Sequence, residues 1–116
     1  MTPRHRLIEL TLFVADLDAS ANFYRALGLD VIEINDPQLH PIRHYDVELG
    51  EMTLMQLFPA NEKHVANQIQ LGLHVRDVTA VASQLDKHGN GWRCSNPNWI
   101  NTLDPDGNRI HVREQR

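Results

Sequence analysis

The chain has 116 residues, of which 41% are hydrophobic and 22% are charged, and its formal net charge is −4. That length predicts a single domain with a modest core, and the acidic balance argues against nucleic acid, which proteins bind through Lys and Arg. No apolar run matches a membrane span and no signal-peptide pattern accompanies the single Cys94, so we expect no membrane partner and a cytoplasmic protein whose cysteine is a buried structural thiol.

The first half of the sequence predicts a strand, a helix and three further strands. Apolar residues alternate along residues 9–14, which predicts a strand with one apolar face. Asp16 or Asp18 is suited to cap the helix that follows, and Gly28 to end it. The three later strands are predicted at Asp30–Ile34, Arg43–Leu49 and Met52–Phe58.

The second half repeats this pattern. Leu71–Asn90 aligns with Leu10–Leu29 at a constant offset, with Asp77 at the helix cap and Gly89 at the helix end. The later strands are predicted at Trp92–Cys94, Trp99–Leu103 and Arg109–Glu114, with a loop at Ser95–Asn98 and a turn at Asp104–Asn108.

The repeat predicts an α+β fold made of two βαβββ modules that form a cupped, mixed sheet with helices on one face. We expect one domain over residues 1–116, with the first module at about 1–58, a linker at 59–67 and the second module at about 68–116.

Four polar residues occupy repeat-related positions on the strand faces that point away from the helices. They are Glu9, Gln56, Gln70 and His111. Carboxylate, amide and imidazole groups can each donate an electron pair to a divalent metal such as Ni, Mn, Zn or Fe. If the two modules curl toward each other, the four side chains form either a metal site or a polar crevice without metal.

The paired modules, the stretch "LTLFVADLDASANFY", the "ALGL" after the helix and the terminal "DPDGN" followed by a strand resemble the vicinal oxygen chelate superfamily. This group contains glyoxalases, bleomycin resistance proteins and ring-cleaving dioxygenases. The resemblance implies metal ligands on the first and last strands of each module, which fall on Glu9, Gln56, Gln70 and His111. It also implies a homodimer in which one cavity draws on one chain or on two.

Three functions are compatible with this resemblance. The first is a metal-dependent lyase, isomerase or transferase acting on a small oxygen-rich metabolite, with Glu9 as ligand and catalytic base. The second is a metal-free protein that binds and sequesters an aromatic or cationic small molecule. The third, a ring-cleaving dioxygenase, needs two histidines and a carboxylate, which this chain reaches only by recruiting His74, so we place it last.

Further side chains are expected to line the ligand pocket. They are Phe13, Phe58, His74, Trp92, Trp99, Arg109 and Arg113. The aromatic rings are suited to stack on a flat ligand and the two arginines to bind a carboxylate or phosphate, while the alternative for each is ordinary packing or solvation.

Overall fold

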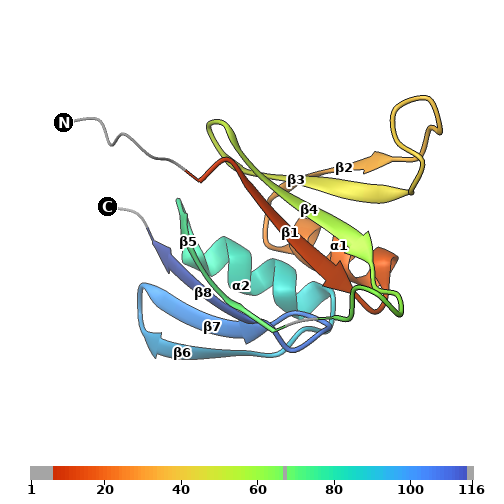
Figure 1. Cartoon of the computed structure of the whole chain (residues 1–116). Coiled ribbons are helices and arrows are strands. Elements are labelled where there is room, and N and C mark those ends of the chain that lie inside the picture. The colour runs from red at the N-terminus through yellow and green to blue at the C-terminus, as the bar shows by residue number, and fades with distance from the viewer. Residues whose placement is uncertain (1–6, 67, 115–116) are drawn as a thin grey trace.

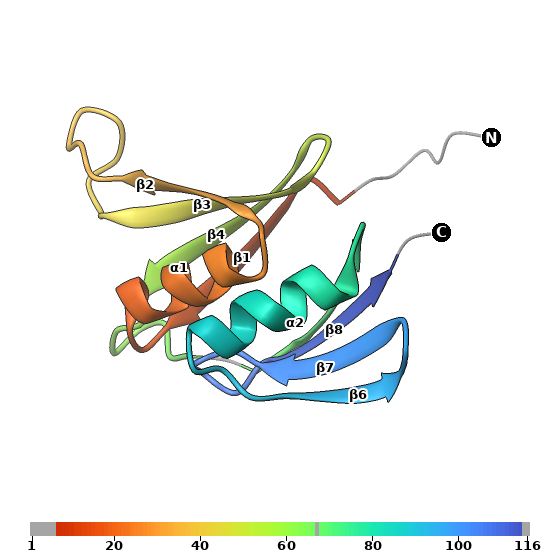
Figure 2. The same ribbon diagram turned by 180° about the vertical axis from the view of Figure 1, so that it is seen from behind.

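The computed structural model describes residues 7–66 and 68–114, which form two four-stranded sheets, each with one helix on one face (Figures 1 and 2). The elements in chain order are β1 Glu9–Val14, α1 Leu17–Ala26, β2 Asp30–Ile34, β3 His44–Gly50, β4 Thr53–Pro59, β5 Gln70–Val75, α2 Val78–Lys87, β6 Trp92–Asn96, β7 Trp99–Leu103 and β8 Arg109–Glu114. The strand orders are β1-β4-β3-β2 and β5-β8-β7-β6. The predicted α+β fold with two βαβββ units is therefore confirmed; the two ends of the predicted domain, at residues 1 and 116, lie outside the described residues.

The helices begin and end where the sequence supplies capping groups. The Asp16 carboxylate accepts a hydrogen bond from Ala19 N at 3.0 Å, and the Asp77 carboxylate accepts from Thr79 N and Ala80 N at 3.0 and 3.1 Å. Of the two candidates for the first cap, Asp16 is the one used. Gly28 and Gly89 adopt φ values of 91° and 73° just beyond the helices, in the left-handed region that favours glycine.

The two modules share the same strand register. In each, the first strand lies parallel to the last strand of its module. Thr11 lies opposite Gln56 in the first module, and Gly72 lies opposite His111 at the equivalent place in the second. The sequence repeat is thus a repeat of backbone pairing as well as of residue type.

Three of the predicted strands have different bounds in the structure. Strands β3 and β4 each begin and end one residue later than predicted. Strand β6 continues to Asn96, through the start of the expected loop, because a register shift between Cys94 and Asn96 lets it keep pairing with β7. Strand β4 includes Pro59, the expected first residue of the linker. In addition, the Cys94 thiol is exposed rather than buried.

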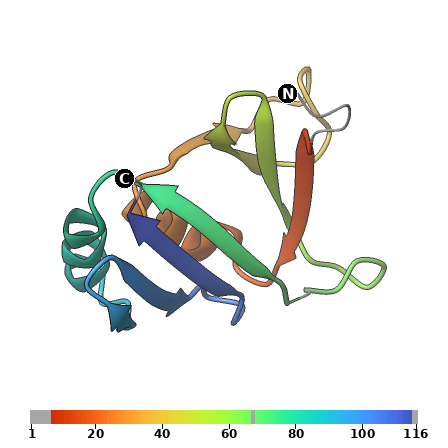
Figure 3. The same cartoon turned by 90° about the vertical axis from the view of Figure 1, so that its left-hand side faces the viewer.

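The halves pack together through the helices. In Figure 2 the two helices lie side by side at the centre, and Figure 3 shows β1 and β5 as the outer strands of separate sheets. The Tyr24 hydroxyl of α1 donates to Asp104 Oδ2, in the turn between β7 and β8, at 2.7 Å. Both groups are buried, and burial together with the Asp104 charge raises the pKa of Tyr24 well above its usual range.

Neither helix among the described residues is long and apolar enough to span a bilayer.

Candidate functional site

Each sheet has one face against its helix and one open face. On β1 and β8, Leu12, Val14, Ile110 and Val112 are buried on the helix side, as the alternation predicted. The residues between them point to the open face. The open faces carry the predicted ligands and most of the predicted pocket residues.

The four predicted metal ligands are divided between the two sheets. Glu9 on β1 and Gln56 on β4 lie in the first sheet, and Gln70 on β5 and His111 on β8 lie in the second. Gln56 Oε1 already accepts a hydrogen bond from Thr11 Oγ1 at 3.4 Å. Over residues 7–66 and 68–114, no three His, Cys, Asp or Glu side chains are grouped so that they could hold a metal ion. Glu9 and His111 are therefore not part of any such group of three among these residues, and the two sheets that carry the four predicted ligands are separate.

The open face of the second sheet contains a hollow of about 260 Å³. Its lining consists of Gly72, Leu73, His74, His111 and Arg113. Gly72 faces His111 across the β5–β8 pair, and a Cβ built on Gly72 would meet no atom within 4 Å. The missing side chain of Gly72 is thus one reason that the hollow exists.

Arg113 is held above the sheet by an aromatic neighbour. In register it lies between His74 on β5 and Trp99 on β7. Its guanidinium carbon lies 3.7 Å from the centroid of the Trp99 ring, a close cation–π contact. The Trp99 and His111 rings are 5.9 Å apart and tilted by 61°. These contacts fix the orientation of the cation at the edge of the hollow.

The open face of the first sheet is covered at one end by histidines. His64 stacks on Phe13 with ring centroids 4.4 Å apart, and His44 stacks on Phe58 at 4.3 Å. His40 packs edge-on against both Phe58 and His44. One face of the Phe13 ring and one face of the Phe58 ring are thus each occupied by a histidine of the protein itself.

The remaining predicted pocket residues lie in different places. Trp99 and His74 are on the open face of the second sheet, and Arg109 is exposed on β8 outside the hollow. Trp92 is on the opposite side, because it pairs with buried Thr102 and donates from Nε1 to Asp86 of α2 at 2.9 Å. The structure therefore places Trp92 on the helix side of the sheet, where it lines a second hollow of about 300 Å³ together with residues of α2, and not at the hollow beside Gly72.

Two features of the site were missed by sequence reasoning. Gly72 stands among apolar and polar residues of β5, and its position opposite His111 could have been obtained by applying the register of the first module to the second. The histidines at 40 and 64 lie in loops, where no periodicity indicates which strand they cover.

Comparison with known proteins identifies relatives of this fold. The family model described as the Glyoxalase/Bleomycin resistance protein/Dioxygenase superfamily matches residues 6–112. A search of curated protein sequences finds no match.

Solved structures with the same fold include proteins of different activity. TnmS3, an antibiotic binding protein from Streptomyces sp. CB03234, is 22% identical over 100% of both chains with a TM-score of 0.73. The trypanothione-dependent glyoxalase I of Leishmania major is 21% identical over 95% of this chain and 86% of its own, with a TM-score of 0.72. Lactoylglutathione lyase from Agrobacterium tumefaciens is 23% identical over 97% and 96%, with a TM-score of 0.66. At these identities the similarity shows the fold alone.

Proposed function

The chain belongs to the glyoxalase/bleomycin resistance protein/dioxygenase superfamily, and from this membership we propose that it binds a small organic molecule on the open faces of its sheets. The observation that carries the proposal is the hollow beside Gly72, where a missing side chain leaves room next to His111 on the neighbouring strand. Clefts lined by apolar surface with a few polar groups are the usual form of small-molecule sites.

A second copy of the chain completes the site in this proposal. The hollow of about 260 Å³ lies slightly below the 300–1,000 Å³ that is typical for such sites, and its lining comes from one sheet only.

A metal-dependent lyase, isomerase or transferase is the second candidate function. The observation that favours it is the shared register, which places Gln56 and His111 at equivalent positions of the two modules. Because one chain divides the four ligands between separate sheets, a site that uses Glu9, Gln56, Gln70 and His111 needs two chains. The bound metal would polarise a substrate oxygen.

The binding proposal is tested by filling the hollow. A library of neutral, anionic and cationic aromatic compounds is titrated into the protein, and binding is measured by the shift of the Trp99 indole N–H signal in ¹⁵N–¹H spectra. We expect at least one class of compound to bind and the Gly72→Val variant to bind it at least tenfold more weakly, because valine would occupy the space beside His111.

Valine is favourable in strands, so the variant is expected to remain folded. Binding that is unchanged by Gly72→Val places the ligand elsewhere, and the absence of binding across the library rejects the proposal.

A further inference from the structure

The ligand class is indicated by the charges around the hollow. Three of its five lining residues, His74, His111 and Arg113, carry groups that donate hydrogen bonds to an anion, and the lining contains no carboxylate. The chain as a whole has a formal charge of −4, so this local balance runs against that of the molecule.

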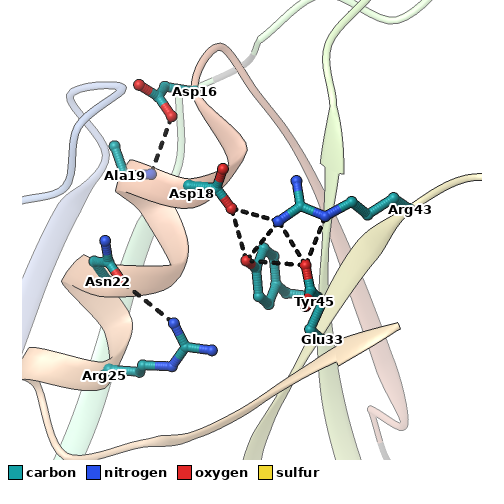
Figure 4. A network of polar contacts seen from close by, with 8 residues as sticks. All are labelled: Asp16, Asp18, Ala19, Asn22, Arg25, Glu33, Arg43 and Tyr45. Atoms are coloured by element: carbon teal, nitrogen blue, oxygen red, sulfur yellow. Dashed lines mark hydrogen bonds and ion pairs between the residues drawn. The ribbon is translucent and has the colours of Figure 1, made fainter. Parts of the chain in front are cut away.

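Among the residues that the structure describes, Arg113 has no acidic partner, whereas Arg43 has two. Arg43 binds Asp18 and Glu33, each at 2.6 Å, and also contacts the Tyr45 hydroxyl (Figure 4). The hydrogen bonds from Arg43 and from the Tyr45 hydroxyl lower the pKa of Asp18. In the part of the chain that the structure describes, no ion pair joins Arg113 to a carboxylate.

The carboxylate nearest to Arg113 in the sequence, that of Glu114, lies on the opposite face of the sheet from the hollow. Glu114 follows Arg113 on β8, and strand alternation sends its side chain to the helix side, where Oε1 accepts from Val78 N at 3.2 Å. The guanidinium carbon of Arg113 lies over the Trp99 ring, and a guanidinium in contact with an aromatic face can still donate hydrogen bonds from its N–H groups.

We infer that the hollow binds the carboxylate of a small aromatic acid, with Arg113 as the anion-binding residue and the space beside Gly72 taking part of the ring system. This inference rests on the proposed function and specifies its ligand. A guanidinium matches a carboxylate through two parallel hydrogen bonds, which is stronger and more directional than a contact to an amide or an alcohol. The volume of about 260 Å³ is suited to a molecule of one or two rings.

The test compares three probes of the same shape: 2-naphthoate, the neutral 2-naphthamide and the cationic 2-naphthylmethylamine. Affinities are measured by titration calorimetry, and the site is identified from the indole N–H signals of the two tryptophans. We expect 2-naphthoate to bind at least tenfold more tightly than the other two. The Trp99 signal should shift while that of Trp92, which is bonded to Asp86 on the helix side, should not.

Two variants on the same strand face separate a specific contact from general charge. Arg113→Gln is expected to weaken 2-naphthoate binding at least tenfold and to leave 2-naphthamide unchanged. Arg109→Gln removes the same charge from β8 outside the hollow and is expected to change neither affinity more than twofold.

Equal affinity for 2-naphthoate and 2-naphthamide overturns the inference but not the proposed function. A preference for 2-naphthoate that is unchanged in Arg113→Gln has the same consequence. No binding of any of the three probes also overturns the inference. The proposed function fails only if the wider library gives no binding as well.

Discussion

At the scale of single residues, the carboxylate of Asp104 joins the two halves of the molecule. Its Oδ2 accepts from the Tyr24 hydroxyl and from Asn108 Nδ2, and its Oδ1 accepts from the backbone N–H groups of Asp106 and Asn108. Asp104 is 4% exposed, so these donors take the place of water around a buried charge. Only the Tyr24 hydroxyl among them comes from the first module.

We expect Tyr24→Phe to lower the free energy of unfolding by about 1.5–3 kcal/mol, because it removes a hydrogen bond to a buried charged group. Urea denaturation followed by circular dichroism measures the loss. Tyr45→Phe is the matched control, since its hydroxyl bonds the exposed carboxylate of Asp18 at 2.7 Å and water can replace it. Equal losses in the two variants would contradict the role of burial.

At the scale of helices and strands, most of the structure could be predicted because its signals are local. Alternation identifies the buried side of β1, capping aspartates identify the helix starts, and Gly28 and Gly89 identify the helix ends. Trp92 is a residue whose side of the sheet these local signals do not predict. Its side of the sheet depends on how β6 pairs with β7, and a short strand with a register shift gives no clear period.

We expect Asp77→Ala to lower the free energy of unfolding by about 1 kcal/mol, because two N–H groups at the start of α2 lose their acceptor. Thermal denaturation measures this as a lower Tm. Asp77→Ser retains a capping oxygen and is expected to lose little. A serine variant as unstable as the alanine variant would show that the negative charge, and not the cap, is what stabilises the helix.

At the scale of the whole molecule, the arrangement of the two sheets could not be obtained from the sequence. The halves contact through α1, α2 and the turn that holds Asp104, and these contacts connect residues far apart in the chain. Alternation predicts which residues share an open face, but not whether two open faces meet. Whether the Glu9–Gln56 pair and the Gln70–His111 pair lie close together therefore depends on how two chains associate.

The metal-dependent candidate makes a prediction about that assembly. After treatment with a chelator, added Ni²⁺ is expected to raise the Tm of the protein, because a metal that binds only the folded dimer stabilises it. Glu9→Ala and His111→Ala should each abolish the rise. A mixture of the two variants, refolded together, should regain part of it, since one site in each mixed dimer keeps both residues.

A Tm that does not respond to Ni²⁺, Mn²⁺, Zn²⁺ or Fe²⁺ would remove this candidate. A response that survives both substitutions would place the metal at other residues.

The matched register of the two modules has a consequence for selectivity. The strands of the two modules pair in the same register, but the side chains at equivalent paired positions differ. The open face of the first sheet carries the Gln56 amide beside the Thr11 hydroxyl. The open face of the second sheet carries the His111 imidazole beside Gly72, which has no side chain. A ligand that contacts both open faces therefore meets different chemical groups at its two ends. It would therefore be discriminated by the direction in which it lies, so that regioisomers of equal size need not be accommodated equally.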